Sequence, residues 1–197
     1  MKTLHYYFAL MSPFTYLGHD ELMEIADRDD VQVAFHPIKV GAVFSATGGL
    51  PPAKRSPQRQ ALRFAELRRW SARKELPLNL VPEHFPVDES LAARSILALV
   101  RAGHSPWDFI RRAHQAVWAE DRDLSDPATV MDLLKAAGHD AEAITTAAQS
   151  DEIGAAYDAD TDAAIEAGVF GVPTYLVGDE LFWGQDRLEW VEAVLNE

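Results

Sequence analysis

The chain has 197 residues, 48% of them hydrophobic and 25% charged, which is typical of a folded protein with one sizeable core. No apolar run approaches the roughly 18 residues that a membrane-spanning helix needs, so no membrane association is expected. The net charge of −13 opposes binding to phosphate backbones, so no nucleic-acid partner is expected. The N-terminal residues are too few and too aromatic for a secretory signal, which predicts a cytoplasmic protein.

Cysteine is absent, so any sulfur chemistry must come from a ligand. The seven histidines are scattered and form no metal-binding pattern, so no metal site is predicted. Basic side chains gather between Lys54 and Lys74, whereas residues 150–166 carry acidic side chains and no Lys or Arg. This pattern has two interpretations: two solvated helix faces, or a local positive field for a small anion.

The first part of the chain predicts a β-α-β unit. Thr3–Leu10 is rich in aromatic and β-favouring residues and is predicted to be a strand. Ser12-Pro13 then provides an N-cap and a proline at the first helical position, so a helix is expected to begin there and run to about Arg28. Val31–Ile38 predicts a second strand, and a β-α-β unit favours parallel pairing of the two strands.

The middle of the chain, residues 56–168, is predicted to be helical. A polar cap followed by proline marks three expected helix starts, at Ser56-Pro57, Ser105-Pro106 and Asp126-Pro127. Ser90–Ala102 predicts a further helix that Gly103 ends.

The end of the chain returns to β structure. Residues 173–183 contain two β-rich runs around Gly178-Asp179, which is a good two-residue hairpin turn, and a last helix follows. The order β-α-β, helices, β-β-α is the layout of an α/β thioredoxin fold with an inserted helical segment. We therefore predict a thioredoxin-like domain of residues 1–50 and 169–197, and an all-helical domain of residues 51–168.

Three motifs carry a resemblance to a known family. They are SPFTYLG at Ser12–Gly18, GAVFSATGG at Gly41–Gly49, and GVFGVPTYLVGDELFWGQDRL at Gly168–Leu188. Together they resemble the 2-hydroxychromene-2-carboxylate isomerase family, which is related to kappa-class glutathione transferases and DsbA-type proteins. The resemblance implies glutathione as cofactor, a small aromatic carboxylate as substrate, and a homodimer.

Ser12 has two interpretations. On its own it predicts an ordinary N-cap. The resemblance places the glutathione sulfur beside it and makes it the catalytic residue. A helix start favours an anion, and a hydroxyl can donate a hydrogen bond to a thiolate. No G-x-S-x-G pattern surrounds Ser12, so a serine hydrolase is not favoured.

Further glutathione contacts are implied by the resemblance. It implies a cis bond between Val172 and Pro173, which would present the Val172 backbone to the cysteinyl part of glutathione as a short added strand. It also implies contacts from Trp183, Gly184, Gln185 and Asp186. The last helix start suits a carboxylate, and Asp186 suits an α-ammonium group. Simple capping by Gln185 or Asp186 is the structural alternative.

Substrate contacts are implied at Lys54, Arg55 and Phe85. The basic pair would suit a carboxylate and Phe85 an aromatic ring, while a solvated loop and a packed hydrophobic residue are the alternatives. The chain departs from the family pattern at Ala9, where relatives often have Asp, and at Ser45, where they often have Lys. The resemblance therefore predicts the glutathione site more firmly than the substrate.

The activity that the resemblance implies is glutathione-dependent cis–trans isomerisation of 2-hydroxychromene-2-carboxylate or its ring-opened benzylidenepyruvate form, in the breakdown of aromatic compounds. One alternative is a kappa-class-like glutathione transferase, which would release the conjugate. Another is a non-catalytic ligand-binding module on a thioredoxin-like scaffold.

Overall fold

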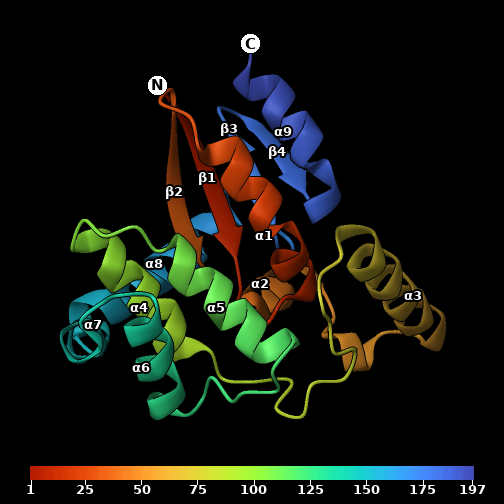
Figure 1. The fold of residues 1–197 in the computed structure, drawn as a ribbon. Coiled ribbons are helices and arrows are strands. Elements are labelled where there is room, and N and C mark those ends of the chain that lie inside the picture. Colours follow the sequence, from red (N-terminus) through yellow and green to blue (C-terminus); the bar gives the residue numbers. More distant parts are fainter.

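The computed structural model describes residues 1–197 and contains one four-stranded sheet (Figure 1). Its strands are β1 (Lys2–Phe8), β2 (Val31–Pro37), β3 (Thr174–Val177) and β4 (Glu180–Trp183), in the order β2-β1-β3-β4. β1 pairs parallel with β2 and antiparallel with β3, and β3 pairs antiparallel with β4. Gly178 and Asp179 form the two-residue turn between β3 and β4, because Val177 pairs directly with Glu180. The predicted thioredoxin fold with a helical insertion is confirmed.

Helix α1 (Pro13–Ala26) follows β1 and begins where the sequence predicts. Ser12 has extended backbone angles, and its side chain accepts a hydrogen bond from the Thr15 N–H. Proline at the first position costs nothing there, since its missing N–H would have had no helical partner. The helix ends two residues before the predicted end at Arg28.

Most of the helices lie between β2 and β3. They are α2 (Val40–Thr47), α3 (Pro57–Lys74), α4 (Ser90–Arg101), α5 (Trp107–Trp118), α6 (Pro127–Ala136), α7 (Ala141–Ala148) and α8 (Asp151–Glu166), with a short 3-10 turn at Pro52–Lys54. Figure 1 shows α4 to α7 gathered at the end of the sheet away from the two chain termini, with α3 standing to one side. None of these helices is both long and apolar enough to cross a membrane.

The structure refines two details of this helical prediction. Residues 75–89 contain no helix, so the segment is not helical throughout. Helix α2 was not predicted, and it has only eight residues and no side-chain cap at Lys39. A short helix without a capping side chain or a proline start leaves little trace in a sequence.

The main core joins the sheet to the inserted helices. One cluster of 35 buried hydrophobic residues includes Tyr6 and Phe8 of β1 together with Phe109 and Trp118 of α5. The Trp118 indole N–H donates to the Leu10 carbonyl over 3.2 Å, and His114 Nδ1 lies 3.1 Å from the same oxygen. Because both partners are buried, α5 fixes the end of β1 immediately before Ser12.

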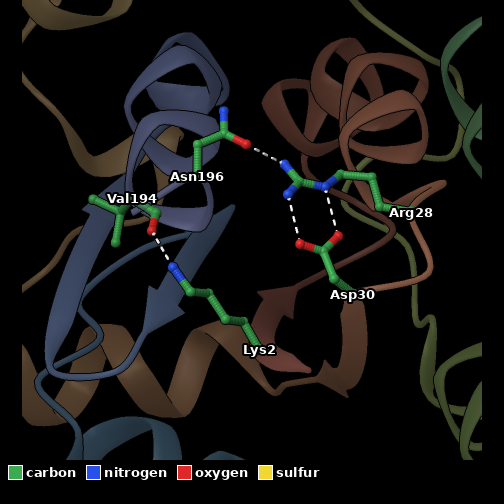
Figure 2. Close-up of polar contacts among 5 residues, drawn as sticks. All are labelled: Lys2, Arg28, Asp30, Val194 and Asn196. Atoms are coloured by element: carbon green, nitrogen blue, oxygen red, sulfur yellow. Dashed lines mark hydrogen bonds and ion pairs between the residues drawn. The ribbon is translucent and has the colours of Figure 1, made fainter.

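The two chain ends lie close together at the other end of the sheet (Figure 1). A 3-10 turn at Gln185–Arg187 leads into α9 (Leu188–Leu195), so the predicted last helix begins as a tighter turn. Figure 2 shows Lys2 Nζ donating to the Val194 carbonyl over 2.9 Å and Arg28 donating to the Asn196 side chain over 2.6 Å. Arg28 also forms an ion pair with Asp30. The contacts of Lys2 and Arg28 with Val194 and Asn196 tie the end of the chain to the start of β1 and to the segment after α1.

Candidate active site

Ser12 lies between the start of α1 and the loop before β3. Its Oγ accepts from the Thr15 N–H over 3.2 Å and lies 3.4 Å from the Val172 carbonyl, to which its hydroxyl donates. The second distance is at the long end for a hydroxyl donor, so this hydrogen bond is weak. Ser12 is 8% exposed, and its hydroxyl hydrogen is therefore held beside a helix start with only a weak acceptor.

The peptide bond between Val172 and Pro173 is cis, as the resemblance implies. The Val172 N–H donates no hydrogen bond within the protein, although Val172 lies just before the start of β3. The Pro173 carbonyl accepts from the Gly184 N–H over 3.0 Å, which ties this loop to the end of β4. A free backbone donor beside a strand is the arrangement that accepts an extended peptide ligand.

A first cavity of about 400 Å³ opens beside Ser12. Its lining is mainly apolar and aromatic and includes no acidic residue: Met11, Ser12, Pro13, Phe14, Val40, Phe44, Gly49, Leu50, Pro52, Arg55, Arg59, Arg63, Phe85, Phe170, Gly171, Val172 and Trp183. Mostly apolar clefts of this size with a few placed polar groups are typical of small-molecule sites.

A second cavity of about 240 Å³ adjoins the first, because Phe14, Val172 and Trp183 line both. Its other lining residues are polar, charged or aromatic and come from α3 and from the turn after β4: Glu66, Trp70, Gly184, Gln185, Asp186 and Arg187. The site therefore has a mainly apolar compartment and a polar one, with Val172 between them.

Gly18 allows α1 to approach the turn that forms the second cavity. A Cβ atom placed on Gly18 would lie 2.8 Å from the Gln185 Cβ and 3.2 Å from the Tyr175 hydroxyl oxygen. Real Cβ atoms do not approach other carbons so closely, so any larger residue would push the turn away from α1. This contact keeps the Gln185 segment next to the helix that carries Ser12.

Glu89 lies behind the site and was missed by the sequence analysis. Its Oε2 accepts a hydrogen bond of 2.6 Å from the Met11 N–H, and the residue is only 4% exposed. Burial raises the pKa of the Glu89 carboxyl to about 8, against the opposing effect of the Met11 and Leu10 N–H groups, and nearby Asp88 raises it further. No basic side chain forms an ion pair with Glu89, so a buried acidic group holds the segment that leads into Ser12.

Two buried histidines lie against each other between α1 and α5. His19 of α1 and His114 of α5 have ring centroids 5.8 Å apart. Burial lowers the pKa of His19 to about 4, and burial and the neighbouring His19 lower the pKa of His114 well below its usual range. Both rings are therefore neutral at physiological pH, and they serve the packing of α1 on α5.

The structure brings most of the predicted site residues together. Ser12, Arg55, Phe85, Val172 and Trp183 line the first cavity, and Val172 and Trp183 also line the second. Gly184, Gln185 and Asp186 line the second cavity only.

The other predicted residues are placed differently. Pro173 lines neither cavity and acts through the conformation of the Val172 loop. Lys54 is exposed on the turn before α3 and does not line either cavity, whereas Arg59 and Arg63 of α3 line the first. The spacing of four residues from Arg55 to Arg59 and on to Arg63 was visible in the sequence, but nothing there showed which side of α3 faces the cavity.

Residues 3–196 match the family model of the DSBA-like thioredoxin domain, and the chain belongs to this family. It is 30% identical over 197 residues to a 2-hydroxychromene-2-carboxylate isomerase of Sphingobium xenophagum, with 98% of each protein covered. It is 21% identical to glutathione S-transferase kappa 1 of Homo sapiens, covering 100% of this chain and 92% of that protein.

A solved structure of a 2-hydroxychromene-2-carboxylate isomerase superposes with a TM-score of 0.79 and 28% identity, covering 98% of this chain and 94% of that one. These matches confirm the predicted resemblance to the 2-hydroxychromene-2-carboxylate isomerases and the prediction that the chain is an enzyme of this group.

Proposed function

We propose that the protein is a glutathione-dependent cis–trans isomerase of 2-hydroxychromene-2-carboxylate or hydroxybenzylidenepyruvate-type substrates. The observation that carries the proposal is the place of Ser12, at the start of α1, beside the cis Val172–Pro173 bond and where two cavities meet. Relatives named as isomerases of this kind, and one named as a glutathione transferase, support the assignment. A homodimer in the cytoplasm is part of the same proposal.

The residues present fit glutathione. The unpaired Val172 N–H offers a backbone donor for the cysteinyl unit, and Gly184, Gln185 and Asp186 line a polar cavity suited to the γ-glutamyl end. Bound glutathione would supply a thiolate that adds reversibly to a conjugated double bond, so that the bond can rotate before the sulfur leaves. The chain itself contains no sulfur nucleophile that could replace it.

Ser12 would keep that sulfur ionised. Its Oγ already accepts from the Thr15 N–H, so its hydrogen is free to turn from the weak Val172 acceptor toward an anion. A free thiol has a pKa of about 8.5, and lowering it by about two units takes roughly 2.7 kcal/mol of preferential anion stabilisation. A charge-assisted hydrogen bond of roughly 1.5–3 kcal/mol and a helix-end contribution of about 0.3–2 kcal/mol supply this.

On the substrate side we propose that Arg55 receives a carboxylate and that Phe85 lies against an aromatic ring, with Lys54 contributing from the rim of the site. Phe85 packs 5.3 Å from Trp118 between ring centroids, so its position is fixed by the core. An oriented acceptor and cationic groups near its carbonyl would favour the enolate-like charge that develops during addition.

The proposal is tested by titrating the protein with glutathione in a calorimeter and recording thiolate absorbance near 240 nm at pH 7. We expect binding, a rise in thiolate absorbance, and recovery of free glutathione after turnover of a hydroxybenzylidenepyruvate. A stable glutathione conjugate as product would instead establish a transferase. Binding with no thiolate signal and no turnover would contradict the proposal and favour a ligand-binding module.

Replacing Asp186 by asparagine is expected to weaken glutathione binding about tenfold, because a charge-assisted hydrogen bond to the α-ammonium group becomes a neutral one. The thiol pKa of the bound tripeptide should not change, since Asp186 lines only the second cavity. Asp179→Asn, in the exposed β3–β4 turn, is the matched control. Unchanged affinity in Asp186→Asn would remove the γ-glutamyl end from this cavity.

A further inference from the structure

Glu89 holds the backbone directly behind the predicted thiol site. Its Oε2 accepts a hydrogen bond of 2.6 Å from the Met11 N–H, and Met11 is the residue before Ser12. Met11 and Ser12 both line the first cavity, whereas Glu89 lines neither cavity. The carboxyl group is therefore fixed one peptide unit behind the serine hydroxyl, without contact with a ligand of its own.

No positive charge compensates the Glu89 carboxyl, with which no basic side chain forms an ion pair. Its titratable neighbours are the exposed Asp88 and the buried Tyr157 of α8. Burial raises the pKa of the Tyr157 hydroxyl, and Glu89 and then Asp88 raise it further, so this group is neutral. Lys39 lies over the Tyr157 ring but pairs with Asp158, and the neutral His114 of α5 contacts the carbonyl before Met11.

A buried acid in this position is costly for a purely structural role. Glutamine could accept the same Met11 N–H without the penalty that an ionised, unpaired carboxylate pays in the interior. Burial raises the pKa of Glu89 to about 8, so the group changes its charge in mildly alkaline solution. Titratable groups with such shifted pKa values are frequent at functional sites, and this one adjoins Ser12.

A negative charge on Glu89 would act directly on an anion beside Ser12. The Ser12 hydroxyl and the start of α1 favour one anion there, and a second one nearby would repel it. Two unit charges roughly 10 Å apart in a partly buried site interact by about one pKa unit, which is about tenfold in a binding constant. The charge on Glu89 is therefore large enough to matter for a bound thiolate.

We propose that Glu89 is a positioning residue for the thiolate: protonated, it supports the Met11 backbone and leaves the Ser12 site free of a competing charge, and ionised, it repels the bound sulfur. This inference rests on the proposed function, because it takes the glutathione sulfur to lie beside Ser12. The coupling is mutual by thermodynamic linkage, so a bound thiolate should in turn keep the proton on Glu89.

The test compares glutathione with γ-glutamyl-alanyl-glycine, an analogue that lacks the sulfur, by calorimetry at pH 6.5 and pH 9. Glu89→Gln and the unaltered protein should bind glutathione equally at pH 6.5. At pH 9 we expect Glu89→Gln to bind it about fivefold more tightly, because only the unaltered protein carries the opposing charge. The analogue should bind both proteins equally at each pH, since it brings no charge to Ser12.

Proton release on binding tests the same coupling in the unaltered protein. It is measured at pH 8 in buffers that differ in ionisation enthalpy. We expect glutathione to release about 0.3 proton from the unaltered protein and about 0.7 from Glu89→Gln, because Glu89 takes up part of what the thiol loses. The sulfur-free analogue should release none.

Asp88→Asn is the matched control, since it removes an exposed negative charge next to Glu89 and asparagine can still accept from the Ser90 N–H. It should bind glutathione within about twofold of the unaltered protein at both pH values. Three results would overturn the inference: equal affinities of Glu89→Gln and the unaltered protein at pH 9, a difference that the analogue shares, or release of about 0.7 proton from the unaltered protein. Each of these leaves the proposed function standing, whereas absence of glutathione binding at pH 6.5 would contradict both.

Discussion

Replacing Ser12 by alanine is expected to raise the thiol pKa of bound glutathione by about one to two units, because a charge-assisted hydrogen bond of roughly 1.5–3 kcal/mol is lost. At neutral pH the ionised fraction, and with it the isomerisation rate, should fall by roughly threefold to 25-fold, because a thiol with a pKa of about 6.5 is already mostly ionised there. The rate should recover as the pH is raised through the new pKa. Thiolate absorbance near 240 nm as a function of pH measures the shift directly.

The same substitution also removes a helix cap, so a control must separate the two effects. Ser150 caps α8 in the same way, accepting from the Ile153 N–H over 3.3 Å, and it lines neither cavity. Ser150→Ala should lose about 1 kcal/mol of stability, as Ser12→Ala does through its cap, without changing the thiol pKa. A bound thiol pKa that is the same in Ser12→Ala and in the unaltered protein would show that Ser12 is only a cap.

Replacing Glu89 by glutamine is expected to remove a large pH dependence of folding. The carboxyl has a pKa of about 8 in the folded protein against an ordinary value of 4.5, so between these values the folded state binds a proton that the unfolded state has released. Stability from this group is complete below about pH 4.5 and is lost as the pH rises through about 8. The loss is on the order of 5 kcal/mol, because the two pKa values differ by about 3.5 and each pKa unit corresponds to about 1.4 kcal/mol.

Chemical denaturation at several pH values between 5 and 9 tests this pH dependence. The free energy of unfolding is compared between Glu89→Gln and the unaltered protein. His19 and His114 act in the opposite direction, since their depressed pKa values reduce stability as the pH falls below about 6.5. Their contribution is common to both proteins and cancels in the comparison. Glu83→Gln, at an exposed site, is the control. Parallel pH profiles for Glu89→Gln and the unaltered protein would contradict a raised pKa at Glu89.

Local signals in the sequence predicted most of the fold. Proline after a polar cap marked the starts of α1, α3 and α6 at the correct residues, and Gly178-Asp179 marked the hairpin. The Ser105-Pro106 signal was one residue early, because Pro106 lies outside α5, which begins at Trp107. These features are local, so the chain needs no distant contact to reveal them.

Parts of the site depend on distant contacts, and for that reason the sequence did not reveal them. Glu89 has the sequence surroundings of an ordinary surface residue before a helix, and only the approach of Met11, 78 positions away, makes it a buried acid. Arg59 and Arg63 belong to a basic helix that looks evenly solvated, and the position of α3 relative to the start of α1 and the Val172 loop decides which arginines line the cavity. Motif resemblance predicted Ser12, Val172 and Asp186 as site residues, because all three lie within the short motifs that carry it, and the structure places them along the two adjoining cavities.

Helix α3 contributes a single buried residue, Leu67, to the interior, although it provides two of the arginines of the first cavity. Substitutions of exposed residues on such a helix usually change the free energy of unfolding by less than about 0.5 kcal/mol. The segments around Ser12, by contrast, belong to α1 and to the loop that leads into the sheet, where buried substitutions are costly. Substitutions along this peripheral helix can therefore alter the lining of the first cavity at little cost in stability, while the segments around Ser12 tolerate far less change.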